Sequence, residues 1–126
     1  MQYTIENDET LGICIVRVSG ENRRPDDSKV LQKVANDIRS KSGCTRFLYD
    51  MQQANIIGST MDTFFTGIEP FKKQFERDFR IALVYSGSMD DHKFMEDVVV
   101  NRGYTLRVFS DIEEATSWIV KQLPNN

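Results

Sequence analysis

The pattern of hydrophobic and polar residues along the chain predicts five strands. Residues 3–6 alternate like an edge strand, and residues 11–19 are mostly apolar, as in a strand covered on both faces. The turn residues from Asn7 to Thr10 predict a hairpin between them, and Gly20 is expected to close the second strand. Short apolar runs at 46–51, 80–85 and 104–109 predict three more strands, with the polar stretch 52–55 as a loop.

Apolar residues at helical spacing separate these strands. Four helices are predicted: one from Asp26 to before Ser42-Gly43, one from Ser59 to about 77, one after Ser88 or Asp90 and one before Pro124. Gly67 and Pro70 should kink the second helix near residue 69. The order β-β-α-β-α-β-α-β-α predicts an α/β fold. Its single-layer, mainly parallel five-stranded sheet carries an antiparallel first strand at or near the edge.

Length and charge narrow the class of protein. The 126 residues suit a single domain, 1–126, and 40% hydrophobic with 28% charged residues is typical of a folded domain. A net charge of −3 argues against nucleic acid as a partner. The start of the chain lacks a signal-peptide pattern, and the longest apolar run is Ile81 to Tyr85. We therefore expect a cytoplasmic protein with no membrane span.

The residues that carry most enzyme chemistry are sparse. Cys14 and Cys44 have neither metal nor disulfide spacing and are expected to pack in the core. His92, the one histidine, is expected to be a solvated surface residue. The sequence has no nucleophile elbow, no phosphate-binding P-loop and no dinucleotide fingerprint. We predict a non-enzyme with no cofactor and no metal.

Candidate functional residues gather where the predicted parallel strands end, because ligands bind outside the carboxyl ends of such strands. They are Arg23, Arg24, Asp50, Gly58, Ser59, Thr60, Ser86, Ser88 and Ser110. Ser59 and Thr60 start a predicted helix, where a phosphorylated hydroxyl would find free N–H groups; the alternative, which the sequence alone favours, is a simple N-cap. Asp50 could also be a phosphoacceptor of the kind found in receiver domains. This is disfavoured, because receiver domains place a pair of acids after the first strand and a lysine after the fifth. The matching places in this chain carry Glu21-Asn22 and Ser110.

The predicted kinked helix is rich in phenylalanine. It either packs in the core or covers an apolar pocket for a lipid tail or a partner chain, lined by Phe64, Phe65, Ile68 and Phe71. A basic cluster near its end is either a solvated face or a patch for a membrane surface or an acidic partner; it comprises Lys72, Lys73, Arg77 and Arg80.

The order of elements resembles the STAS domains, the anti-sigma-factor antagonists, and most closely their SpoIIAA-like branch, also described as STAS/SEC14-like. The segment Leu48-Tyr49-Asp50 leads through a polar loop to Gly58-Ser59-Thr60. In the second half, the resemblance rests on residues 80–84, the segment Arg107-Val108-Phe109 before Asp111, and Glu114-Ala115 before Trp118. It covers nearly the whole chain.

The resemblance implies a regulatory module of bacterial type that acts through protein contacts around residues 52–65. The family's phosphorylation switch, the serine of an Asp-Ser-Ser-Gly pattern, falls on Thr60, with Gly58 in place of the aspartate and Met61 in place of the glycine. The alternative is a binder of a lipid or another small apolar ligand beneath the helix 60–77. An exposed strand edge also permits a homodimer.

Overall fold

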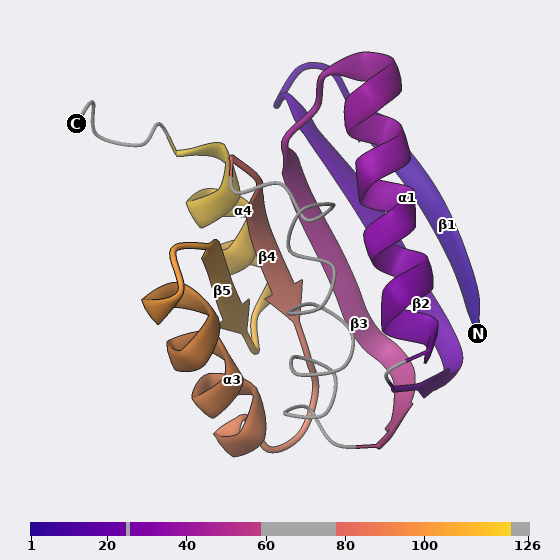
Figure 1. Cartoon of the computed structure of the whole chain (residues 1–126), viewed down its shortest axis with the longest axis vertical. Helices are drawn as coiled ribbons and strands as arrows, with labels where there is room; N and C mark the ends of the chain where they lie inside the picture. The colour runs from indigo at the N-terminus through magenta and orange to yellow at the C-terminus, as the bar shows by residue number, and fades with distance from the viewer. Residues whose placement is uncertain (25, 59–77, 122–126) are drawn as a thin grey trace.

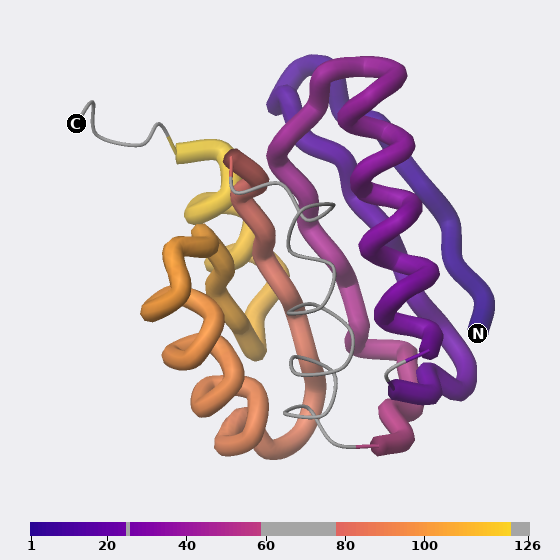
Figure 2. The backbone as a smooth tube through the Cα atoms, in the orientation of Figure 1, coloured from indigo at the N-terminus to yellow at the C-terminus, as the bar shows by residue number. Residues whose placement is uncertain are grey.

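The computed structural model describes residues 1–24, 26–58 and 78–121, and these form a five-stranded sheet with three helices packed on its two faces (Figure 1 and Figure 2). The strands are β1 (Gln2–Asp8), β2 (Ile13–Arg23), β3 (Arg46–Ile57), β4 (Arg80–Val84) and β5 (Thr105–Phe109). They lie side by side in chain order; β1 is antiparallel to β2, and every later pair is parallel. The predicted mainly parallel sheet with an antiparallel edge strand is confirmed.

The helices cover the two faces of the sheet unequally (Figure 1). They are α1 (Asp26–Ser42), α3 (Asp90–Asn101) and α4 (Ile112–Val120). Helices α1 and α3 lie on one face, here called the front face, because successive crossovers of one hand between neighbouring strands return to the same side. Helix α4 follows the last strand and packs on the back face. The helix predicted at 59–77 lies outside the described residues.

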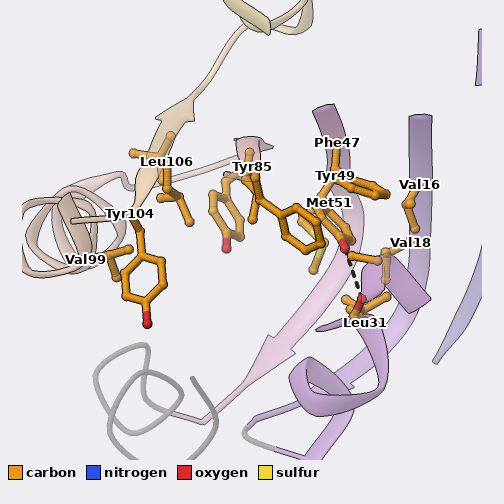
Figure 3. Packing of buried hydrophobic residues seen from close by; sticks show 14 of the residues in the cluster. Val16, Val18, Leu31, Phe47, Tyr49, Met51, Tyr85, Val99, Tyr104 and Leu106 are labelled. Carbon is orange, nitrogen blue, oxygen red and sulfur yellow. Dashed lines mark hydrogen bonds between the residues drawn. The ribbon is translucent and has the colours of Figure 1, made fainter. Parts of the chain in front are cut away.

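The larger part of the core lies on the front face. Alternate residues of the central strands point there, including Val16 and Val18 of β2 and Tyr49 and Met51 of β3. The Tyr49 hydroxyl donates a hydrogen bond of 3.0 Å to the carbonyl of Leu31, which fixes α1 to the middle of the sheet (Figure 3). Burial raises the pKa of the Tyr49 hydroxyl, so it acts here as a neutral donor.

Strands β2 and β3 are longer than the sequence predicts, and both run on past the end of β4 (Figure 1). Gly20 does not close β2: with a φ of 78° it lies inside the strand, opposite Ala54. Residues 52–55 are strand and not loop, because β2 pairs with them through backbone groups that are independent of side-chain polarity. The prediction failed because it used side-chain hydropathy alone.

The pairing of β2 with β3 contains one bulge. Arg17 lies opposite Asp50 and Ser19 opposite Gln53, so β3 carries one extra residue between them. The extra residue reverses the alternation, and Ala54 and Ile56 therefore pack on the same face as Met51. This reversal hides the period of two that would have identified residues 52–57 as strand.

Helix α4 is held at its C-terminal end by two arginines from the amino ends of the strands. Arg80 Nη2 donates to the carbonyl of Trp118 at 2.5 Å, Arg80 Nη1 donates to the carbonyl of Lys121, and Arg46 Nη1 donates to that of Val120 at 3.1 Å. The Arg80 guanidinium also lies over the Trp118 ring, 4.4 Å from its centroid. These bonds satisfy carbonyls that a helix end otherwise leaves unpaired.

These contacts change two expectations. Arg80 is 4% exposed, so it does not belong to a solvated basic face, and Lys72, Lys73 and Arg77 lie outside the described residues. Helix α4 ends at Val120, before Pro124 is reached, because Lys121 is already extended. In the part of the chain that is described, no helix has the length and apolar character needed to cross a membrane.

The beginnings and ends of the other helices are mostly as predicted. Asp111 is the N-cap of α4 and accepts a bond of 2.9 Å from the N–H of Glu113. Gly103, with a φ of 94°, ends α3, as its sequence indicates. The start of α3 differs, because the N-cap is Met89, which makes no side-chain cap bond. Cys14 is buried in the core, as expected, and both cysteines are free.

Candidate carboxyl-edge site

The ends of β2 and β3 are fixed to each other at the carboxyl edge of the sheet. The N–H of Arg24 donates a bond of 2.8 Å to the carbonyl of Ile57. Gly58 follows with a φ of 109°, and a Cβ atom there would lie 2.9 Å from the Arg24 carbonyl oxygen. Only glycine fits both the left-handed backbone and this close approach. The last described residue of this segment, Gly58, is therefore held against the backbone of Arg24.

The side chain of Arg24 extends from this junction to the end of β4. Its Nη2 donates a hydrogen bond of 2.7 Å to the hydroxyl of Tyr85, and its guanidinium carbon lies 5.6 Å from the centroid of the Tyr85 ring. Tyr85 is 2% exposed and belongs to the front-face core, where it lies among the cluster drawn in Figure 3. The buried ring thus gives the guanidinium a rigid support.

His92 completes this group from the first turn of α3. Its ring lies parallel to that of Tyr85, with 1° between the planes and 3.6 Å between the centroids. The expectation of a solvated histidine is therefore wrong: the side chain is half-buried, and Nδ1 is buried with no hydrogen-bond partner among the described residues. We call Arg24, Tyr85 and His92 the carboxyl-edge triad.

Protonation of His92 is disfavoured by its surroundings. Burial lowers its pKa below the usual 6.5, the positive charge of Arg24 lowers it further, and Asp91 opposes them. The imidazole is therefore neutral at pH 7, with Nδ1 and Nε2 offering one donor and one acceptor. Sequence reasoning named Arg24 as a candidate but missed Tyr85 and His92. Their pairing depends on the position of α3 against β4, which no local pattern in the sequence encodes.

Asp50 does not lie at the end of a strand as the sequence suggested. It lies inside β3, opposite Arg17 on β2 and Val84 on β4. Its Oδ1 accepts a bond of 3.1 Å from the N–H of Gln52, across the bulge. This bond explains Asp50 as a residue that shapes the bulge of β3.

The other candidates at this edge lie apart from the triad. Arg23, the last residue of β2, is exposed and pairs with Glu21 at 2.9 Å, while its N–H donates to Asp27 at 2.7 Å. Ser86 donates a bond of 3.3 Å to the carbonyl of Gln52, and Ser88 accepts one of 3.5 Å from the N–H of Asp90. Ser110 is exposed after β5. Ser59 and Thr60 lie outside the described residues.

A small cavity lies on the front face beside the triad. Its volume is about 80 Å³, and its lining combines Arg24, Ser28 and Gln32 with apolar residues of the sheet, including Met51 and Leu83. Ligand pockets typically measure about 300–1,000 Å³, so this cavity by itself does not accommodate a lipid tail. The residues of the predicted apolar pocket, Phe64, Phe65, Ile68 and Phe71, lie outside the described residues.

Metal ligands do not cluster in the ranges 1–24, 26–58 and 78–121. No group of three or more His, Cys, Asp or Glu side chains there could hold an ion. The chemistry at the carboxyl edge is that of a guanidinium, a phenol and an imidazole held against one another, a set of groups that both donate and accept hydrogen bonds.

Comparison with solved structures shows the fold. An anti-sigma factor antagonist from Mycobacterium paratuberculosis matches with a TM-score of 0.62 and 12% identity, over 95% of this chain and 94% of its own. The Bacillus cell fate determinant SpoIIAA in its phosphorylated form matches with a TM-score of 0.54 and 12% identity, over 93% and 99%. No family model matches the sequence, and no curated protein matches it.

A third solved structure extends the comparison to a protein without an assigned role. It is an uncharacterised Shewanella loihica protein of the DUF3478 family with a SpoIIAA-like fold, at a TM-score of 0.59 and 13% identity, over 94% of this chain and 92% of its own. The chain therefore has the SpoIIAA-like fold over nearly its whole length, and the resemblance read from the sequence is confirmed at the level of the fold.

Proposed function

We propose that the chain is a non-catalytic regulatory module that acts through protein contacts at the carboxyl edge, with phosphorylation of Ser59 or Thr60 as its switch. The observation that carries the proposal is the shared fold: this chain aligns over at least 93% of its length with anti-sigma factor antagonists, one of them solved in a phosphorylated form. Proteins that share a fold can differ in function, so the local geometry must also agree.

The junction at Gly58 supports this proposal. Residue 58 is held against the backbone of Arg24, and two hydroxyl residues follow it directly in the sequence. A phosphoryl group added there would bring a charge of about −1.5 to −2 at neutral pH next to the guanidinium end of β2. A change of that size at one edge alters the surface offered to a partner without requiring any change in the sheet.

The exposed polar residues at the same edge are suited to protein contact. Gln53 and Asn55 are exposed on the part of β3 that extends past β4, and Gly58 is exposed directly after the strand. Neutral amide side chains can bond to a partner's backbone without the large desolvation cost that charged groups carry. We therefore assign the contact surface to residues 52–65, whose described part is the end of β3.

Native mass spectrometry of the chain purified from its own cells tests the switch. A mass increase of one phosphate that survives denaturation and maps to residue 59 or 60 supports the proposal. An unmodified chain under every growth condition would reject phosphorylation as the switch. A lipid-sized addition that is lost on denaturation would instead favour the carrier function, and the same spectrum gives the oligomeric state.

Capture of partners by charge variants tests the contact surface. Thr60→Asp is expected to reduce partner recovery about tenfold relative to Thr60→Ala, because it places a permanent negative charge in the contact surface. Ser117→Asp adds the same charge to the exposed surface of α4 and is the matched control. Equal recovery with Thr60→Asp and Thr60→Ala would contradict the proposal.

A further inference from the structure

The two outermost strands of the sheet, β1 and β5, differ in how their open sides are covered (Figure 1). At β5, the N–H of Val108 donates a bond of 2.8 Å to Oε1 of Glu96 on α3, whose side chain is only 13% exposed. Helices α3 and α4 also contact β5, one from each face of the sheet. Glu96 thus takes the place of the carbonyl that a further strand would offer, which protects this edge strand from pairing.

Strand β1 lies entirely within the described residues and shows no such protection. All its residues except Asp8 are exposed, and its pairing with β2 runs from Gln2 to Asp8 without a bulge. The strand contains neither lysine nor proline, which commonly prevent pairing at an edge. The outer side of β1, which is the side away from β2, therefore presents a regular row of backbone N–H and carbonyl groups.

Apolar side chains accompany this row on the front face. Tyr3 and Ile5 share the face of the core residues opposite them on β2, yet they are 41% and 47% exposed. Val30 of α1 is 42% exposed. It is two residues, about half a turn, from both Ser28 and Gln32, which line the cavity beside β4, so it lies on the β1 side of the helix. We call Tyr3, Ile5 and Val30 the β1 strip.

We propose that the outer side of β1 pairs with the same strand of a second copy of this chain, in an antiparallel arrangement centred on Ile5. A two-fold axis perpendicular to the sheet makes the two strands antiparallel and puts the front faces of both copies on the same side. The two sheets then join into one. The β1 strips of the two copies meet on the front face and are covered there.

The sequence of β1 is complementary to itself in this register. All seven residues are paired, no two like charges face each other, and each of the two carboxylates lies opposite a hydrogen-bond donor of the second copy. An axis shifted to Thr4 would instead leave Asp8 without a partner. The facing residues are Ile5 with Ile5, Tyr3 with Asn7, Thr4 with Glu6, and Gln2 with Asp8.

The difference between the outermost strands limits the association to two copies. Pairing of β1 with β5 of another copy would build an open-ended array, but it would have to displace Glu96 from Val108. Pairing of β1 with β1 uses up both open strands and closes the assembly. The two-fold axis also directs the carboxyl edges of the two copies to opposite ends of the joined sheet, so the inference does not depend on the proposed function.

Analytical ultracentrifugation of the full chain over a range of concentrations tests the proposal. We expect twice the mass of one chain at high concentration and the mass of one chain on dilution. Ile5→Lys puts two positive charges side by side at the axis and should weaken association about 100-fold. Phe94→Lys is the matched control, because it makes the same kind of change at an exposed apolar residue of α3, and it should leave association unchanged.

Charge variants at residue 4 test the register. Because residue 4 faces Glu6 of the second copy, Thr4→Lys should associate about tenfold more tightly than Thr4→Glu. Arg17 faces residue 4 within the same copy and acts on it in both the single chain and the dimer. Ser117→Lys and Ser117→Glu make the same changes of net charge on the exposed surface of α4 and are the controls.

Three results would overturn the proposal. The first is the mass of one chain at every concentration up to about 1 mM. The second is equal weakening by Ile5→Lys and Phe94→Lys, which would place the interface elsewhere. The third is a difference between the two Thr4 variants that is no larger than that between the two Ser117 variants. Partner capture by the Thr60 variants concerns the carboxyl edge, so its failure is distinguishable from any of these.

Discussion

The two ends of the sheet use arginine in opposite ways. At the amino ends of the strands, Arg80 and Arg46 donate to three backbone carbonyls at the end of α4, and Trp118 covers the guanidinium of Arg80. At the carboxyl ends, Arg24 bonds to a hydroxyl and lies beside an aromatic pair that includes a neutral histidine. The first arrangement connects two elements of the fold, whereas the second brings together side chains from three separate elements at one edge of the sheet.

This difference shows that similar electrostatic surroundings can have different consequences at the two edges. Burial lowers the pKa of Arg80, and the neighbouring Arg46 lowers it further, yet an arginine stays protonated and the helix carbonyls compensate its charge. The pKa of His92 is lowered by similar causes, but a histidine, unlike an arginine, can lose its proton. The same physical effects therefore produce a structural contact at one edge and a responsive site at the other.

The largest expected effect on stability comes from breaking the contact between Arg80 and the end of α4. Arg80→Met removes two hydrogen bonds to the end of α4, one to the carbonyl of Trp118 and one to that of Lys121, so the free energy of unfolding should fall by about 3 kcal/mol. Equilibrium unfolding in urea measures this change. Arg107→Gln, at an exposed position on β5, serves as the control and should stay within about 0.5 kcal/mol of the wild type.

The next effect concerns the junction between β2 and β3. Gly58→Ala combines a positive φ with a Cβ atom 2.9 Å from the Arg24 carbonyl, and should lower the free energy of unfolding by about 2 kcal/mol. Gly12→Ala has a positive φ with open space around it and should lower it by about 1 kcal/mol. Equal losses in the two variants would show that the contact with Arg24 has no energetic weight.

A smaller effect on stability, with a clear spectroscopic signature, is expected at the triad. Arg24→Gln removes the charge that opposes protonation of His92, so the pKa of His92 should rise toward 6.5. Stability should fall by only about 1 kcal/mol, because the hydrogen bond lost to Tyr85 lies at a partly exposed site. A pH titration of the His92 ring signals measures the direction of the change. An unchanged pKa would show that the charge of Arg24 does not act on the imidazole.

The smallest effect is the pH dependence of folding. Because the folded pKa of His92 lies below the unfolded value of about 6.5, its contribution to stability is complete above that pH and is lost as the pH falls toward the folded pKa. His92→Gln should remove this component from the slope of stability against pH, as measured by thermal unfolding between pH 5 and 8. A slope that is the same in both proteins would place the pH dependence elsewhere.

Much of the fold could be predicted from the sequence, because apolar periodicity reports directly on burial. The predicted strands and described helices are present, and the first strand is antiparallel at the edge. The pattern failed at residues 52–57, where the bulge reverses the alternation and the pairing depends on backbone groups. Hydropathy carries no information on either feature.

The candidate site could be predicted only in part. Arg24 and Gly58 were found from their places after strands, since the ends of parallel strands meet at one edge. Asp50 was predicted at the end of its strand, but β3 continues to Ile57. The stacking of His92 on Tyr85 was missed, because it joins residues of different elements. A lone histidine after a Ser-Gly-Ser loop has no local signal that distinguishes a stacked ring from a solvated one.

Quantitative capture of partners tests the central claim, that the carboxyl edge is the functional edge of the sheet. The full chain is expressed at native level in its own cells as wild type, as Arg24→Gln and as Arg107→Gln, and the recovered proteins are quantified together. The account predicts that Arg24→Gln reduces the recovery of specific partners about tenfold, whereas Arg107→Gln recovers them as the wild type does. Equal recovery of the same partners by all three chains would contradict it.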